Sequence, residues 1–228
     1  MEIIEGIHRV DEASANMAHA NVYLVINGEE LTVIDTGTSG NAKKALEYVQ
    51  KLGRQPTDVK TIILTHFHMD HIGSAKELKD LTHAKVAAHA EDADYVSGKE
   101  PLPKPKNILF RVFSSFVKPV PVHVDIILKE GDRIANLAVI HTPGHTPGSI
   151  MLLDEERKVL FAGDTLRYDG KKVSGAPGQF NVDSKQVNES IAKASTLSFD
   201  IMLPGHGETL RPNASDEIKK FNETLKQK

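Results

Sequence analysis

The sequence predicts an α/β protein in which two β-sheets pack together and helices lie on their outer faces. Short runs of β-branched and aliphatic residues alternate with helical patterns in both halves of the chain, and this interleaving favours such layers. The chain has 228 residues, enough to bury a sizeable core without disulfides or metals. Its 39% hydrophobic and 26% charged residues are typical of a globular protein, and we expect a single domain over residues 1–228.

The first half of the chain alternates between the two kinds of pattern. Asn27-Gly28 favours a tight turn between two strands, and Gly53 is a typical residue for ending a helix. The apolar run at 61–64 has the length of a buried strand. The predicted elements are strands at 21–26 and 31–34, a helix with Ala45, Leu46, Val49 and Leu52 on one face, a strand at 61–64, a helix at 74–79 and a strand at 85–88.

The second half is richer in strands. We expect its last helix to begin at Ser215, because a serine side chain can cap the first turn of a helix. The predicted elements are strands at 125–128, 137–140, 149–153 and 158–161, a helix with Val187, Ile191, Ala194 and Leu197 on one face, a strand at 201–203, and a C-terminal helix carrying Ile218, Phe221 and Leu225.

One segment, at about 98–121, does not follow this alternation of strand and helix patterns. It holds five of the eleven prolines and a markedly apolar middle that includes Phe110, Phe113 and Phe116. It can pack on the core, form a lid or pocket wall for a hydrophobic substrate, or make a contact between two copies of the chain. We name the three phenylalanines as candidate pocket residues.

The charge balance and the absence of cysteine narrow the functional classes. A formal charge of −3 gives no reason to expect nucleic acid or a membrane surface as the main partner, so we expect a small-molecule substrate. Without cysteine there are no disulfides, thiolate zinc sites, iron–sulfur clusters or cysteine nucleophiles. The acidic N-terminus does not read as a signal peptide and no apolar run is long enough to span a bilayer. We therefore expect a cytoplasmic protein.

A cluster of histidines directly follows the strand at 61–64. Three imidazoles and a carboxylate fall within six residues, and buried apolar packing does not explain such a cluster. Nitrogen and oxygen donors are the ligands that borderline divalent metals prefer. The segment reads His66-Phe67-His68-Met69-Asp70-His71. It therefore predicts metal binding.

Three later turns each place one further donor at or near the end of a strand. His145 lies in a TPGHT turn, Asp164 follows a glycine in a GDT turn, and His206 lies between glycines in a PGHG turn. Glycines at these positions allow the backbone to approach closely. Together with the histidine cluster they supply five histidines and two aspartates, which suits two metal ions held about 3.5–4 Å apart with one bridging carboxylate.

These motifs, with Val33-Ile34-Asp35-Thr36-Gly37 before them, resemble the metallo-β-lactamase superfamily over residues 33–207. The resemblance implies an αββα sandwich with the site at the sheet edges. It also implies that Asp35 fixes the ligand loop through hydrogen bonds. In this family pattern one metal ion is held by His66, His68 and His145, the other by Asp70, His71 and His206, and Asp164 bridges them.

The resemblance further implies a hydrolase. Two divalent ions, with Zn²⁺ expected and Mn, Fe or Co also compatible, lower the pKa of a bound water to about 7 and create a hydroxide nucleophile. Asp70 is a candidate to orient this water or to accept a proton, beyond its role as a ligand. Tyr168 lies four residues after Asp164, close to where N-acyl homoserine lactonases carry a tyrosine that hydrogen-bonds the lactone, so it is a second candidate catalytic residue.

The expected substrate is a lactone or carboxylic ester. Phosphodiesters or phosphotriesters and thioesters of the glyoxalase II kind are the alternatives, and an iron persulfide dioxygenase is less favoured. Six histidines match no ligand position, and we expect structural or surface roles for them. They are His8, His19, His83, His89, His123 and His141. His19 is also a candidate pocket residue, because its polar loop at 14–21 joins two strands and can overhang the site.

Overall fold

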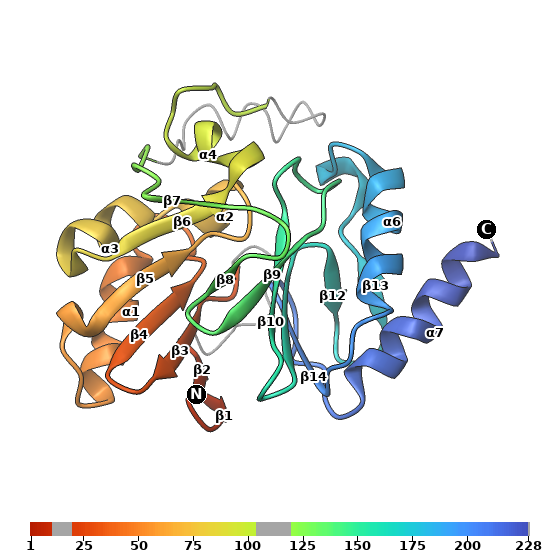
Figure 1. The fold of residues 1–228 in the computed structure, drawn as a ribbon, viewed down its shortest axis with the longest axis horizontal. Coiled ribbons are helices and arrows are strands. Elements are labelled where there is room, and N and C mark those ends of the chain that lie inside the picture. The colour runs from red at the N-terminus through yellow and green to blue at the C-terminus, as the bar shows by residue number, and fades with distance from the viewer. Residues whose placement is uncertain (11–19, 104–119, 228) are drawn as a thin grey trace. The chain divides into compact units, whose positions relative to one another are not determined.

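Runs of consecutive strands and a stretch where helices and strands alternate follow one another along the chain (Figure 1). The computed structural model describes residues 1–10, 20–103 and 120–227. Contacts divide the chain into two compact units, Met1–Leu128 and Lys129–Lys228, called here the first and second units. Every helix in these described ranges is too short or too polar to cross a membrane.

The first unit is built on a seven-stranded mixed sheet whose strands follow one another in chain order. The first four strands pair antiparallel, and the last four pair parallel. The parallel half matters for function, because the carboxyl ends of parallel strands lie at one edge of a sheet. The strands are β1 (Glu2–Ile4), β2 (Ile7–Arg9), β3 (Tyr23–Asn27), β4 (Glu30–Ile34), β5 (Val59–Ile63), β6 (Lys85–His89) and β7 (Ile126–Leu128).

Helices cover one face of this sheet and close its main core. Val49 of α1 and Leu78 of α3 belong to the same buried cluster as Leu24, Val33 and Ile62 of the strands. Every second residue of a strand points to the same face of the sheet, and the amphipathic helices pack their apolar sides against these residues. The helical elements are α1 (Asn41–Lys51), the 3₁₀ turn η1 (Pro56–Asp58), α2 (Met69–Ile72), α3 (Ala75–Thr82) and α4 (Ala90–Val96).

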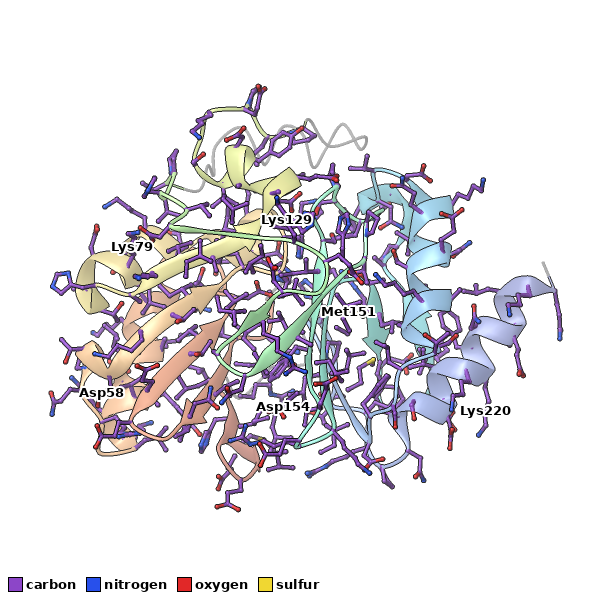
Figure 2. The ribbon with its side chains drawn as sticks, in the orientation of Figure 1. Asp58, Lys79, Lys129, Met151, Asp154 and Lys220 are labelled. Atoms are coloured by element: carbon purple, nitrogen blue, oxygen red, sulfur yellow. The ribbon has the colours of Figure 1, made fainter. Side chains whose placement is uncertain are left out.

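The second unit has a five-stranded sheet in the order β14-β11-β10-β9-β8 and a separate β12–β13 hairpin. Strands β11 and β14 pair parallel and the other neighbours antiparallel. A second buried cluster joins Met151 (labelled in Figure 2) to residues of α6 and α7. The elements are β8 (Arg133–Ile134), β9 (Leu137–His141), β10 (Ile150–Asp154), β11 (Val159–Gly163), β12 (Leu166–Tyr168), β13 (Val173–Gly175), η2 (Gly178–Phe180), α6 (Ser184–Ala194), β14 (Ile201–Pro204) and α7 (Ala214–Lys226).

The predicted α/β class, with two large mixed sheets and helices, is confirmed. The hairpin at Asn27-Gly28 forms as predicted, with Gly28 at φ 63°. The start of the last helix is a correction. Its N-cap is Asn213 at φ 61°, and Ser215 lies inside the first turn. Asparagine tolerates this left-handed backbone better than most residues, so the chain turns there.

Some elements were not predicted, and some predicted features fall outside the described ranges. Helix α4 was missed because its N-cap is His89, whose ring accepts the backbone N–H of Glu91, and histidine is not among the favoured caps. The short strands β1, β2, β8, β12 and β13 carry no clear alternation. The candidate pocket residues His19, Phe110, Phe113 and Phe116 lie outside the described residues. The single domain stays a prediction.

Asp125 ties β6 to the surface helix α3 in the first unit. Its Oδ2 accepts the backbone N–H of Val86 at 2.8 Å and pairs with the ammonium of Lys79, which Figure 2 labels on the outside of the unit. Burial raises the pKa of the Asp125 carboxyl, but the Lys79 and Val86 hydrogen bonds outweigh it, and the net pKa lies below its ordinary value.

We predict that Asp125→Asn lowers the free energy of unfolding by about 1–2 kcal/mol at pH 7. A depressed pKa stabilises the fold above the unfolded carboxyl pKa, and this is lost as pH falls through the folded pKa, so wild type and variant should converge in acid. Urea unfolding, followed by far-UV circular dichroism at pH 7 and at acid pH, measures the loss of stability and its dependence on pH. Asp80→Asn, in the exposed Lys76–Asp80 pair, is the control and should change little. An equal loss in both variants would contradict the prediction.

Candidate metal centre

The first unit gathers four potential metal ligands directly after β5. His68 is the N-cap of the single-turn helix α2, which carries Asp70 and His71. A ring nitrogen of His66 lies within 4.8 Å of one on His68 and of one on His71. His66 and His71 are buried, whereas the Asp70 side chain is 32% exposed. The cluster expected from the sequence therefore forms, with one carboxylate open to solvent.

Asp35, at the end of β4, holds this segment. Its Oδ2 accepts hydrogen bonds from His71 Nδ1 and from Thr65 Oγ1, each at 2.7 Å, and its Oδ1 accepts the Thr65 backbone N–H at 2.8 Å. The Thr65 hydroxyl has only one hydrogen, so His66 Nδ1, 3.1 Å from Oγ1, must be the donor there. Both imidazoles thus carry their hydrogen on Nδ1 and keep the Nε2 lone pair for a metal.

Asp92 is a second buried carboxylate that supports the cluster. It is 1% exposed and lies on α4, where its Oδ2 accepts the backbone N–H of Phe67 at 3.0 Å. Phe67 lies between His66 and His68, so this bond fixes the turn between two ligands. No local pattern indicates Asp92 in the sequence, because it lies 25 residues from Phe67 on a helix that the sequence analysis does not predict.

The second unit brings the three other predicted ligands together around one oxygen atom. Asp164 Oδ2 lies 3.5 Å from Nε2 of His145 and 3.5 Å from Nε2 of His206. Two ligands of a tetrahedral ion at 2.0–2.1 Å are separated by about 3.3–3.4 Å. All three residues are buried. The spacing is therefore that of ligands arranged around a small cation.

A short segment before α6 positions His145. Asn181 Oδ1 accepts from His145 Nδ1 at 2.9 Å, which again leaves the lone pair on Nε2. The backbone N–H of Asp183 donates to the Gly144 carbonyl at 2.9 Å. Gly144 has φ 126°, and a Cβ there would come within 2.4 Å of the Val187 nitrogen. The glycine lets the ligand turn approach α6, and Asn181 is a supporting residue that sequence reasoning missed.

Tyr168 and Arg167 lie on β12, directly after the Asp164 turn. Tyr168 packs against the core of the second unit, and its carbonyl accepts the Glu208 N–H at 2.8 Å. A Cβ at Gly207 would come within 2.2 Å of that carbonyl, so glycine is required beside His206. The catalytic role of Tyr168 stays a prediction. Arg167, which the sequence did not single out, donates a hydrogen bond to Asp164 Oδ2.

The other described histidines take part in local structure or lie at the surface. Burial lowers the pKa of His8, whose Nδ1 contacts the Tyr48 hydroxyl at 3.1 Å. His141 Nε2 contacts the Pro147 carbonyl at 2.8 Å, and the His123 side chain is 79% exposed.

The donor chemistry of both units fits divalent metal ions. Three imidazoles have Nδ1 fixed by an oxygen acceptor, which directs the lone pair of Nε2 outward. The carboxylates of Asp70 and Asp164 add oxygen donors, and imidazole with carboxylate is the set that suits zinc, iron, manganese or cobalt. His66, His71 and His145 therefore have the tautomer that such ions need, and the proposed ligands of each unit lie close together.

Comparison with known proteins agrees with this chemistry. A family model described as the metallo-beta-lactamase superfamily matches residues 16–206. Human acyl-coenzyme A thioesterase MBLAC2 is 32% identical over 215 residues, covering 83% of this chain and 74% of that protein. Hydroxyacylglutathione hydrolase GloC of Haemophilus influenzae is 29% identical over 187 residues, covering 77% and 79%. The crystal structure of TTHA1623 in a di-iron-bound form matches with a TM-score of 0.71 at 28% identity, covering 90% and 94%. This chain is a metallo-hydrolase of the metallo-β-lactamase superfamily.

Proposed function

We propose that this protein hydrolyses thioesters at a centre of two divalent metal ions. The observation that carries the metal dependence is the fixed protonation of His66, His71 and His145, each with Nδ1 bonded to an oxygen acceptor. The thioester is supported by two relatives, which are named as an acyl-coenzyme A thioesterase and a hydroxyacylglutathione hydrolase. Sequence reasoning alone favoured a lactone or carboxylic ester, with thioesters as an alternative.

The proposed ligands are those that the family pattern implies. One ion would be held by His66, His68 and His145, the other by Asp70, His71 and His206, with Asp164 as the shared carboxylate. Such ions supply two things when bound: they lower the pKa of a water molecule and they polarise the carbonyl group of the substrate. Zn²⁺ is the expected metal from the donor types, and elemental analysis would distinguish it from iron, manganese or cobalt.

The chain's own residues then have defined tasks. Hydrolysis forms a C–O bond between water and the acyl carbon and breaks the C–S bond, giving a carboxylate and a thiol. Asp70 is 32% exposed and is the solvent-accessible carboxylate of the first-unit cluster, with Oδ2 3.9 Å from His71 Nε2. We assign it the transfer of the water proton to the departing sulfur. The chain has no cysteine nucleophile, and in this proposal a water molecule attacks the acyl carbon.

A substrate panel tests the reaction class. We expect the purified protein to release thiol from acyl-coenzyme A or S-lactoylglutathione at least about tenfold faster, in kcat/KM, than it opens lactones or cleaves carboxylic esters and phosphodiesters. Ellman's reagent reads only the released thiol, since the protein contains no cysteine. Faster lactone opening would restore the substrate favoured by the sequence. Oxygen consumption with a persulfide, without hydrolysis, would exclude the hydrolase.

A second prediction concerns the metal. His68→Ala and Asp164→Asn should each lose bound metal and at least about 100-fold in kcat/KM, because each removes a proposed ligand. Elemental analysis of the purified variants measures the first effect and the thiol assay the second. His123→Ala, an exposed histidine outside the ligand set, is the control and should retain both. Full metal content in either ligand variant would contradict the assignment.

A third prediction concerns Asp35, a positioning residue. Asp35→Asn keeps the shape but removes the charge that orients His71 and Thr65, so metal affinity should fall about 10–100-fold. Competition with a chromophoric chelator measures this without any turnover. Asp58→Asn, which removes an exposed charge in η1, should leave metal affinity unchanged. An unchanged affinity in Asp35→Asn would show that the bond to His71 does not influence the metal.

A further inference from the structure

Arg167 is a half-buried cation beside the proposed metal ligands, and neither the family pattern nor the proposed reaction uses it. It lies three residues after Asp164, on β12, and donates through Nη2 to Asp164 Oδ2. Its side chain is only 14% exposed. Among the described residues, its Nε is buried without a hydrogen-bond partner. An arginine is always charged, so a full positive charge lies in this interior.

The contact involves the one oxygen on which the second-unit ligands converge. Asp164 Oδ2 receives the guanidinium and also lies 3.5 Å from Nε2 of both His145 and His206. An imidazole carries no permanent charge, whereas a guanidinium always does, and an unbalanced buried charge strongly destabilises a fold. The guanidinium supplies this balance in the metal-free protein.

Asp164 is the proposed shared ligand, and its Oδ2 is the oxygen that lies 3.5 Å from both imidazoles, so a conflict of charge arises there. A divalent cation bound to Oδ2 would lie within a few ångströms of the guanidinium, where two positive charges repel strongly. The guanidinium contact with Oδ2 therefore opposes metal binding at the same oxygen.

We propose that Arg167 is an exchangeable counter-ion: it holds Asp164 in the metal-free protein and gives up Oδ2 when metal binds. The inference rests on the metal centre of the proposed function. The backbone can stay in place during the exchange, because Arg167 pairs with Ser174 across the hairpin and Tyr168 forms a bridge with Gly207. Only the long side chain has to turn away.

The consequence is a trade-off between two measurable properties. Arg167 stabilises the metal-free fold, and it weakens metal binding because its charge must be displaced. Arg167→Gln removes the charge and keeps a hydrogen-bonding side chain. The variant should unfold at a lower temperature without metal and yet bind Zn²⁺ more tightly.

The chain contains a matched control for this variant. Arg157 also follows an aspartate by three residues in the second unit, and its Nη1 lies 2.8 Å from Oδ2 of Asp154, which is labelled in Figure 2. The Asp154 side chain is as buried as that of Asp164, at 3% exposed each. The Asp154 pair is not part of the proposed ligand set. Arg157→Gln therefore reports the general effect of losing such a pair.

The experiment uses the full chain, stripped with chelator and then titrated with Zn²⁺. We expect the metal-free Tm of Arg167→Gln to fall by about 5–10 °C. Its Zn²⁺ dissociation constant, from competition with a chromophoric chelator, should fall at least about tenfold. Arg157→Gln should lower Tm without changing the dissociation constant. Arg167→Lys keeps the charge, so its metal-free Tm and its Zn²⁺ dissociation constant should both stay near those of wild type. This variant tests the role of the charge even if Arg167→Gln does not fold.

Each outcome has a definite meaning. The counter-ion role alone would be overturned if Arg167→Gln bound Zn²⁺ no more tightly than wild type. It would also be overturned if Arg167→Lys, which keeps the charge, bound Zn²⁺ at least about tenfold more tightly than wild type. The wild-type titration separates this from a failure of the proposed function. A wild-type chain that binds no metal at all would overturn both.

Discussion

The carboxylate of Asp164 is the point on which the rest of the site depends. It is buried, and a buried negative charge is tolerated only when cations or hydrogen-bond donors surround it. The second unit is arranged to meet this need. Two imidazoles reach the same oxygen from turns after β9 and β14, and Arg167 reaches it from the next strand. Glycines 144 and 207 permit the close backbone approaches that bring those turns together.

In the first unit, parallel strands bring the functional side chains to one edge of the sheet. Asp35 follows β4, His66 follows β5, and Asp92 lies in the helix that follows β6. Because β4, β5 and β6 are parallel neighbours, their carboxyl ends lie at one edge of the sheet. The ligand and the two carboxylates that hold its loop are therefore delivered to one place by topology. Hydrogen bonds then set the imidazole protonation that a metal requires.

Much of this could be predicted from the sequence, for physical reasons. Apolar periodicity identifies the longer strands and helices because burial imposes it, and Asn27-Gly28 identifies the hairpin because Gly28 needs a positive φ. The proposed ligands between His66 and His71 can also be recognised from the sequence, because they lie within six residues. Asn181 and Asp92 were not, because each reaches its partner from a distant element and no local pattern marks it. The cap at Asn213 depends on a backbone turn that side-chain propensity does not specify.

The groups that gather around Asp164 also need a balance of charge while no metal is bound. Hydrogen-bond acceptors at Nδ1 are sufficient for the histidines, because a neutral imidazole costs little to bury once one nitrogen is bonded. A carboxylate needs more, since its charge persists at neutral pH. A lysine would provide the charge as a single compact ammonium group, whereas a guanidinium presents several donors in a plane, one of which Arg167 uses on Asp164. An arginine on the strand that immediately follows Asp164 can therefore hold this carboxylate in the metal-free protein, and in the proposal some metal affinity is lost as a result.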